Sequence, residues 1–361
     1  MSAVHGQQDA CICHDDGMSG TGPVPAIQTV TGPISPDDLG RTLMHEHLTV
    51  GWPGAESHTT VARRSRADVV AVCVDRIAEL QELGYSTLVD PCPNDLGRDV
   101  SLLVEVSEAT GFNIICATGL YKESEGGHAY WSFKARYEDV TSVMAEMFES
   151  ELTDGVGGSG ARPGILKVAT GLGGMTDHER RVFDAAAAAA LATGAPITTH
   201  TDEGTVGDLQ QEVLTGAGVP AHRILVGHSC GTTDADYHEG IAAGGSYLGF
   251  DRFGIAALQP DTDRVASLVE VIRRGYGDRV VVSHDSVWCW QGEPFPARSM
   301  GRLGEIFDPT RFDREIVPML LEAGVEDAEV EALVVDNPRR FFTGEPLPAG
   351  GGTVPPGQPP V

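Results

Sequence analysis

Short runs of apolar and β-branched residues recur along the chain, and each is followed by a polar segment and then by a stretch with helical spacing. Runs that are almost continuously apolar are typical of strands buried on both faces of a parallel sheet. Eight such runs are found, at Thr42–Leu48, Ser86–Cys92, Phe112–Tyr121, Ile165–Thr170, Pro196–Thr201, Arg223–Ser229, Tyr247–Gly254 and Val280–Ser286. The pattern predicts a chain of repeated strand–helix units.

The segments between these runs follow the period of an amphipathic helix. One predicted helical face carries four apolar residues, Val69, Cys73, Ile77 and Leu80. Gly84 is placed to end that helix, because glycine adopts the left-handed conformation that closes many helices. Thr176 and Glu179 form a candidate capping box at the start of an Ala-rich helix that runs through Leu191.

Eight strand–helix units over roughly 245 residues match an α/β protein with a (β/α)8 TIM barrel in number and length. A doubly wound sheet is the alternative architecture, but no Gly-rich phosphate loop follows the first predicted strand. The barrel is expected as a single domain over residues 25–342, with a short N-terminal strand segment and helices at the C-terminal end.

The two ends of the chain have a different composition from the rest. Residues 1–24 are polar, Gly-rich and without periodicity, and are expected to be disordered, while Pro and Gly dominate residues 343–361 and predict a loose tail. Cys11, Cys13 and His14 form a weak candidate metal cluster, because no second pair of ligands lies near them.

Composition limits the possible partners and compartments. The 361 residues carry a formal net charge of −27, which argues against nucleic acid or an anionic membrane as partner. The sequence contains no apolar run of about 18 residues, so no membrane-spanning helix is expected. The first twenty residues have neither the basic region nor the apolar region of a secretion signal. Seven cysteines, an odd number without framework spacing, favour a reduced cytoplasmic protein.

Titratable side chains fall at or near the ends of several predicted strands. These residues are His45, His47, Lys167, His200, His228 and Asp285. In a TIM barrel the C-terminal ends of the strands converge on one mouth, where active sites lie. Each residue alone has an ordinary structural explanation, such as a hydrogen-bonded core histidine or a lysine that reaches the rim. All six together predict a metal site at the barrel mouth.

The chemistry of these residues suits divalent metal ions. His45 and His47 alternate with Glu46 along a strand, so both imidazoles face the same side. Imidazole and carboxylate ligands suit zinc and similar ions. A buried Lys167 amine, kept neutral, can react with carbon dioxide to give a carbamate that bridges two metals. Asp285 can both bind a metal and accept a proton from an activated water.

Several motifs give the chain a resemblance to the phosphotriesterase-like family of the amidohydrolase superfamily. The motifs are TVTGPISPDDLGRTLMHEHL at 29–48, NDLGRDVSLL at 94–103, ATGLY at 117–121, GILKVAT at 164–170, TTHT at 198–201, GHSCGTTD at 227–234, GFDRFG at 249–254 and SHD at 283–285. The resemblance covers about Val30 to Phe342 and implies a (β/α)8 barrel with a binuclear metal centre and a bridging hydroxide as nucleophile.

The resemblance also implies how the ligands are divided. By this likeness, His45, His47 and Asp285 hold the more buried ion, while His200 and His228 hold the more exposed one. A carboxylated Lys167 bridges both. The same likeness implies a homodimer, and two ions of which zinc is the first expectation and manganese, cobalt or iron are alternatives.

The lactonase branch of this family has a tyrosine after strand three and an Asp-Arg pair after strand seven. Tyr121 matches the first, and Asp251 with Arg252 matches the second. A phenol there could hydrogen-bond a lactone and help to protonate the leaving alkoxide. Alternatively, Tyr121 only packs in the wall, and Arg252 forms an ion pair with Asp251 that shapes the loop.

Aromatic residues near the predicted mouth are further candidates for substrate contact. Trp288 and Trp290 lie in the loop after strand eight, where they suit an acyl chain, an aryl phosphate or a dimer contact. The charged segment after strand three adds His128, Tyr130 and Trp131 as weaker candidates.

The sequence therefore predicts a metal-dependent hydrolase of ester bonds that acts on a small molecule. The expected activity is the opening of lactone rings, most of all N-acyl-homoserine lactones, a quorum-quenching reaction, with promiscuous phosphotriesterase activity. Phosphotriesterase (aryldialkylphosphatase) or another carboxylic ester hydrolase is the alternative main activity. The alternative that is not an enzyme is a binding protein that has the barrel but no turnover. That alternative predicts that at least one metal-ligand residue has been replaced, but all six predicted metal ligands are present.

Overall fold

The computed structural model describes residues 26–347, except 297–298, 300–302 and 304. The expected disordered segment 1–24, the candidate cluster of Cys11, Cys13 and His14, and most of the expected tail lie outside the described residues. The division of the chain into segment, barrel and tail therefore stays a prediction.

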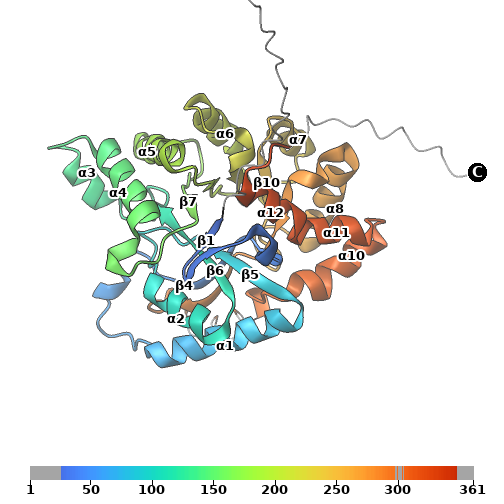
Figure 1. The fold of residues 1–361 in the computed structure, drawn as a ribbon, viewed down its shortest axis with the longest axis horizontal. Helices are drawn as coiled ribbons and strands as arrows, with labels where there is room; N and C mark the ends of the chain where they lie inside the picture. Colours follow the sequence, from blue (N-terminus) through green and yellow to red (C-terminus); the bar gives the residue numbers. More distant parts are fainter. Residues whose placement is uncertain (1–25, 297–298, 300–302, 304, 348–361) are drawn as a thin grey trace, which may run out of the picture.

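Eight parallel strands form the central sheet, surrounded by helices (Figure 1). In spatial order they are β11 (Val280–Val282), β10 (Tyr247–Phe250), β9 (Ile224–Val226), β8 (Ile197–Thr198), β7 (Ile165–Lys167), β6 (Asn113–Gly119), β5 (Tyr85–Asp90) and β3 (Arg41–Leu43). Each neighbouring pair is parallel. The predicted (β/α)8 TIM barrel is confirmed.

The barrel closes between its first and last strands. The backbone N–H of Met44 donates to the carbonyl of Val282 at 3.3 Å. Just beyond, β4 (Glu46–Val50) pairs in parallel with β12 (Ser286–Trp290). The chain segments that carry His45, His47 and Asp285 are therefore neighbours, although some 240 residues separate them in the sequence.

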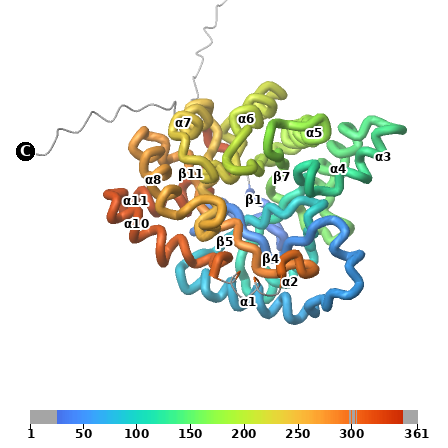
Figure 2. The backbone as a smooth tube through the Cα atoms, turned by 180° about the vertical axis from the view of Figure 1, so that it is seen from behind, coloured from blue at the N-terminus to red at the C-terminus, as the bar shows by residue number. Residues whose placement is uncertain are grey.

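Helices follow the strands in sequence and cover the outside of the barrel, as the two opposite views show (Figures 1 and 2). The main ones are α1 (Arg66–Glu82), α2 (Val100–Thr110), α3 (His128–Lys134), α4 (Val140–Asp154), α5 (Asp177–Thr193), α6 (Gly207–Gly216), α7 (Ala235–Ala243) and α8 (Asp261–Val271). The predicted capping box is present, because Glu179 N donates to the Thr176 hydroxyl while the Glu179 carboxylate accepts from Thr176 N. Of the predicted apolar face on α1, Val69 is only half-buried.

The strands are shorter than the apolar runs that predicted them. The first run is divided into β3 and β4 at Met44 and His45, and only Ile197 and Thr198 of the fifth run lie in a strand. Some backbone pairing continues beyond the strands, since Thr199 N donates to the Leu225 carbonyl and His200 N to the Val168 carbonyl, each at 2.9 Å. Regular pairing ends where the chain turns at the barrel mouth. His228 and Asp285 lie at such turns, with φ of +57° and +53°.

The ends of the described chain pack against the barrel and each other. An N-terminal hairpin of β1 (Ile27–Thr29) and β2 (Gly32–Ile34) matches the predicted short strand segment. Three helices follow residue 316, α10 (Val317–Glu322), α11 (Asp327–Val334) and α12 (Asp336–Thr343). Ile27, Leu39 and Phe341 share one buried cluster. In the part of the chain that the structure describes, no helix has the length and apolarity needed to span a membrane.

Candidate functional site

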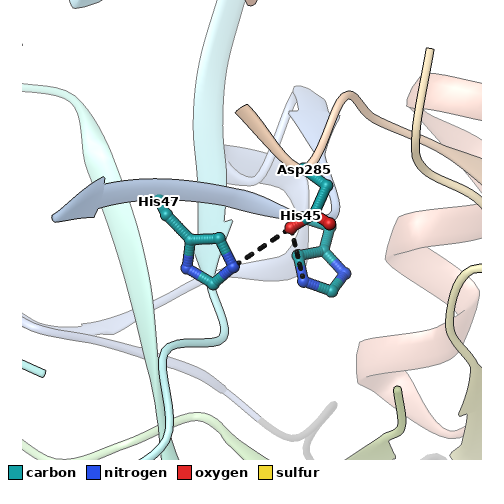
Figure 3. Close-up of side chains that lie close together, drawn as sticks. All are labelled: His45, His47 and Asp285. Carbon is teal, nitrogen blue, oxygen red and sulfur yellow. Dashed lines mark ion pairs between the residues drawn. The ribbon is translucent and has the colours of Figure 1, made fainter. Parts of the chain in front are cut away.

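His45 and His47 come together with Asp285 at the mouth of the barrel (Figure 3). The Nε2 atoms of His45 and His47 lie 3.5 and 3.3 Å from the same oxygen of Asp285, Oδ1. Asp285 follows β11 by three residues, and its backbone N–H donates to the His45 carbonyl at 3.0 Å. Two imidazole nitrogens and a carboxylate oxygen therefore converge on one point, as three ligands of a metal ion do.

Each of these imidazoles is oriented by a carboxylate behind it. His45 Nδ1 lies 3.1 Å from Asp251 Oδ2, and His47 Nδ1 lies 3.1 Å from Asp90 Oδ1. A carboxylate at Nδ1 favours the tautomer with the proton on Nδ1. Nε2 is then unprotonated and can bind a metal ion, which is the usual arrangement at histidine metal ligands. The donor set thus fits a metal ion at the Nε2 side.

Asp251 links two imidazoles through both of its oxygens. Its Oδ1 accepts from the backbone N–H and the Nδ1 of His228, each at 2.9 Å. The Nε2 of His228 then faces Asp285 Oδ2 at 3.8 Å. Burial alone would raise the pKa of Asp251, but the imidazoles of His228 and His45 lower that pKa well below its usual range. Asp251 is therefore a buried anion that fixes His45 and His228 together.

Lys167 is the last residue of β7 and lies inside the barrel with almost no exposure. Its Nζ donates to the Thr199 carbonyl at 3.0 Å and lies 3.4 Å from His45 Nε2. Burial lowers the pKa of Lys167 to about 8. A substantial fraction of this amine is therefore neutral near pH 8, which is the form that reacts with carbon dioxide.

His200 lies next to His228 and also contacts Tyr121. The two imidazole rings have centroids 4.6 Å apart. The Tyr121 hydroxyl is 3.4 Å from both ring nitrogens of His200. His200 Nε2 is 2.8 Å from Asp202 Oδ1, and Lys122 donates to both oxygens of Asp202. The structure thus brings all six predicted ligands and Tyr121 to one place.

Arg252 contacts the site directly. Its Nε donates to Asp285 Oδ2 at 2.8 Å. The ion pair of Arg252 in the described residues is with Asp285, while the two oxygens of Asp251 contact the imidazoles of His45 and His228. Burial would raise the pKa of Asp285, but His228 and Arg252 are the main charges that lower it well below the usual range.

A cavity of about 560 Å³ opens above these residues. Besides the six ligands, Tyr121 and Arg252, its wall includes apolar side chains, Val50, Trp52, Ile255, Leu258 and Trp290. Trp290 stacks on Trp52 with ring centroids 5.5 Å apart. Trp288 points elsewhere and lines a second cavity. His128, Tyr130 and Trp131 lie on α3 and are not among the residues that line the cavity.

The sequence reasoning missed several residues that support the site. Asp90 ends β5, so the rule of polar residues at strand ends would have found it. Glu46 is fully buried, and its Oε1 accepts from the Ser283 hydroxyl at 2.7 Å and from the His284 backbone N–H at 2.9 Å. Glu46 thereby fixes the turn that presents Asp285. No local signal identifies the partner of Glu46, since it lies about 240 residues away.

Comparisons with known proteins find similar sequences and structures over most of the chain. A family model described as "Phosphotriesterase family" matches residues 25–342. The phosphotriesterase homology protein of Mycobacterium tuberculosis is 35% identical over 88% of this chain and 98% of that protein. The organophosphorus hydrolase structure from Deinococcus radiodurans is 38% identical in sequence and matches with a TM-score of 0.84. The match covers 89% of this chain and 99% of the Deinococcus radiodurans chain. A further structure concerns organophosphate hydrolysis engineered from a weak promiscuous lactonase template, with 37% identity, 88% and 100% coverage and a TM-score of 0.84.

Proposed function

The chain belongs to the phosphotriesterase family and is a metal-dependent hydrolase of ester bonds. We propose that its main activity is the opening of lactone rings, most of all those of N-acyl-homoserine lactones. The single observation that carries the proposal is the Tyr121 hydroxyl, which stands 3.4 Å from His200 inside the cavity. A lactone needs a proton donor at its leaving oxygen, and Tyr121 is placed to supply one.

The family is one of binuclear metal hydrolases, and the donor set described above fits two divalent ions. In this proposal His45, His47 and Asp285 would hold one ion, His200 and His228 would hold the other, and a carbamate on Lys167 would serve both. When bound, two such ions lower the pKa of a water molecule towards neutrality and polarise the oxygen of the group under attack. Zinc is the first expectation, with manganese, cobalt or iron as alternatives.

Asp285 and Arg252 have complementary tasks in this proposal. Asp285 is held ionised by the charges around it, so it can accept the proton of the attacking water. Arg252 donates to Asp285 Oδ2 at 2.8 Å and thereby fixes the orientation of that carboxylate. Arg252 also lines the cavity, where its remaining N–H groups can donate to substrate oxygens.

Tyr121 and the apolar wall account for the choice of substrate. Burial raises the pKa of Tyr121 well above its usual value, so the phenol keeps its proton and can donate it to the leaving alkoxide. Trp52, Leu258 and Trp290 offer apolar surface for an acyl chain. One similar structure is titled as organophosphate hydrolysis engineered from a weak promiscuous lactonase template, which supports lactone hydrolysis in proteins of this fold.

Phosphotriesterase is proposed as a weaker side activity and as the alternative main activity. The same activated water can attack phosphorus as well as a carbonyl carbon, and one similar structure is named an organophosphorus hydrolase. A triester with an aryl leaving group does not need the Tyr121 proton, so this activity would leave the phenol without a role. Another carboxylic ester remains the third substrate class.

The test is a hydrolysis assay with a pH indicator on metal-loaded protein. The panel contains homoserine lactones of increasing acyl length, aliphatic lactones and paraoxon, with Asp285→Asn as the inactive control. Lactone turnover that exceeds paraoxon turnover by orders of magnitude, and is lost in the control, supports the proposal. Robust paraoxon turnover with little lactone turnover would assign the protein to the triesterases instead.

A homodimer and a cytoplasmic location are proposed alongside this function. The homodimer rests on the likeness to the family. The location rests on the seven cysteines, of which the five in the described part of the chain are all free and buried. Sedimentation velocity at several protein concentrations tests the oligomeric state.

A further inference from the structure

A second cavity, of about 730 Å³, lies beside the reaction cavity. It is bordered by the start of α1, by α2 and by β12. In both views α1 and α2 lie side by side along one edge of the barrel (Figures 1 and 2). The cavity contains none of the six proposed metal ligands, but it shares Val287, Trp290, Phe295 and Phe307 with the reaction cavity. The two cavities therefore meet at a common, mainly aromatic wall.

One side of this second cavity is apolar. Trp288 contributes a large ring and is only 8% exposed, and Val69 and Leu102 add aliphatic surface. The indole Nε1 of Trp288 is buried and has no hydrogen-bond partner among the described residues. A buried N–H without an acceptor is uncommon in a folded protein, and an oxygen atom of a ligand would satisfy it.

The other side of the cavity is cationic, with four arginines against three carboxylates, Glu56, Asp99 and Glu293. Two of the arginines already have partners. Arg66 binds Asp99 at 2.9 Å and Glu105 at 2.7 Å, and Arg76 binds Glu79 at 3.0 Å.

Arg63 and Arg64 are different, because neither forms an ion pair with a carboxylate in the described part of the chain. Arg63 donates to the Glu56 backbone carbonyl at 2.7 Å, and Arg64 makes a long contact of 3.9 Å to Cys289 Sγ. Both precede α1, whose N-terminal end carries partial positive charge. Two adjacent arginines without carboxylate partners therefore border this cavity.

We propose that this second cavity binds an amphipathic carboxylate, with its hydrocarbon body against Val69 and Leu102, its carboxylate between Arg63 and Arg64, and a ligand oxygen as the acceptor for the buried Trp288 N–H. A guanidinium matches a carboxylate with two parallel hydrogen bonds, and a cavity of this size holds a small ligand. The ligand has two possible sources, a free fatty acid or the ring-opened product of the proposed lactone hydrolysis. Only the second source rests on the proposed function. A ligand in this cavity would contact Trp290, which also lines the reaction cavity.

The experiment is calorimetric titration of the metal-loaded full chain with sodium decanoate, with decanol as the uncharged analogue and with ring-opened N-decanoyl-homoserine. The variants are Arg63→Gln/Arg64→Gln, Arg63→Lys/Arg64→Lys and Arg180→Gln, the last removing an exposed arginine that pairs with Asp184 on α5. We expect decanoate to bind at least tenfold more tightly than decanol. The glutamine pair should lose at least tenfold in decanoate affinity. The lysine pair should lose less than the glutamine pair, because it keeps the charge but not the two parallel hydrogen bonds, and Arg180→Gln should stay near the original value.

Different outcomes distinguish the sources and overturn the proposal. Tighter binding of the ring-opened compound than of decanoate identifies the product as the ligand, and equal binding identifies any carboxylate of this shape. Decanoate affinity that is unchanged in the glutamine pair would place the anion elsewhere, such as at the metals, and would overturn the proposal. So would affinity that falls as protein concentration rises, because a second copy would then cover the cavity. Binding is measured without turnover, so the result stands whether or not lactones are substrates.

Discussion

At the scale of single residues, the site depends on carboxylates that hold imidazoles in place. Asp251 is the most connected of them, since it accepts from His45 Nδ1 at 3.1 Å and from His228 Nδ1 at 2.9 Å. We predict that Asp251→Asn lowers metal affinity by about 10- to 100-fold, the usual cost of losing a partner behind a metal ligand. Competition against a chelator of known affinity measures the change.

The matched control for this prediction is Asp263→Asn, which removes the same charge from an exposed position on α8. Its metal affinity should equal that of the original protein. Equal affinities in both variants would mean that Asp251 does not act through the metal ligands. A general loss of folding would be seen as a changed circular dichroism spectrum.

Tyr121 provides a test of the substrate class. We predict that Tyr121→Phe lowers kcat for lactones by about 100-fold, within the range that general acids contribute. Paraoxon turnover should change by less than about threefold, because its aryl leaving group departs as a stabilised phenolate and needs no proton. Steady-state kinetics on both substrates with one enzyme preparation measures the ratio. Equal losses on both substrates would give Tyr121 only a packing role.

Much of the site could be predicted at this scale, since every proposed ligand lies at or near the end of an apolar run. Asp90 follows the same rule, because it is the last residue of β5 and directly precedes Pro91. The partner of Arg252 could not be predicted. Asp251 is its neighbour in sequence, but Asp285 is its partner in space, and that contact depends on how β10 and β11 are placed.

At the scale of secondary-structure elements, one ion pair connects α4 to the loop after β5. Arg98 donates to both oxygens of Glu151 at 2.8 and 2.9 Å, and Thr118 donates to Glu151 Oε2 at 2.6 Å. Burial would raise the pKa of Glu151, but Arg98 and Thr118 lower it below the ordinary value. The carboxylate is thus stabilised in its ionised form in the folded protein.

A lowered pKa in the folded state stabilises the protein above the pKa of the unfolded state, and this contribution is lost as pH falls. We predict that Glu151→Gln lowers the free energy of unfolding by about 2 kcal/mol at pH 7, the value of a hydrogen-bonded charge. The difference from the original protein should shrink below about pH 4.5. Urea denaturation at pH 7, 5 and 4 measures it.

Glu149→Gln on the same helix is the control, because Glu149 is exposed and its carboxylate has no ion pair among the described residues. That variant should stay within about 0.5 kcal/mol of the original protein at each pH. A difference for Glu151→Gln that is the same at pH 7 and pH 4 would contradict the assigned pKa shift.

Elements were predicted well where local chemistry determines them. The capping box of Thr176 and Glu179 starts α5 because both bonds lie within four residues. Strand ends were predicted poorly. In the fifth run, Thr199, His200 and Thr201 are almost as buried as Ile197 but lie beyond β8, although Thr199 N and His200 N still donate to the carbonyls of Leu225 and Val168. Apolar and β-branched composition cannot distinguish a residue inside a strand from one just beyond it.

At the scale of the whole molecule, the proposed ligands come from strands spread around the barrel, so metal ions would connect distant parts of the chain. A ligand that binds only the folded state adds about 2.7 kcal/mol at 100 times its Kd. We predict that chelation lowers the Tm by several degrees and that added zinc restores it. Differential scanning calorimetry measures the change, and an unaltered Tm would contradict metal binding at these positions.

The fold itself was predictable because repeated strand–helix units allow few closed arrangements. The closure could not be assigned in detail, since it depends on contacts between Met44 and Val282 and between β4 and β12. The second cavity could not be predicted from the sequence either, because Arg63 and Arg64 border a cavity only when α1 packs against β12. Contacts between distant segments are the common cause of these gaps.

The most direct test of the account is the number of metal ions held by each chain, measured by plasma mass spectrometry on protein freed of loosely bound metal. The same preparation is assayed for hydrolysis, beside Lys167→Ala. The account predicts about two equivalents in the original protein, with turnover that rises in proportion to metal content, and fewer equivalents with little turnover in the variant. Less than one equivalent in a protein that still hydrolyses its substrate would contradict the binuclear site.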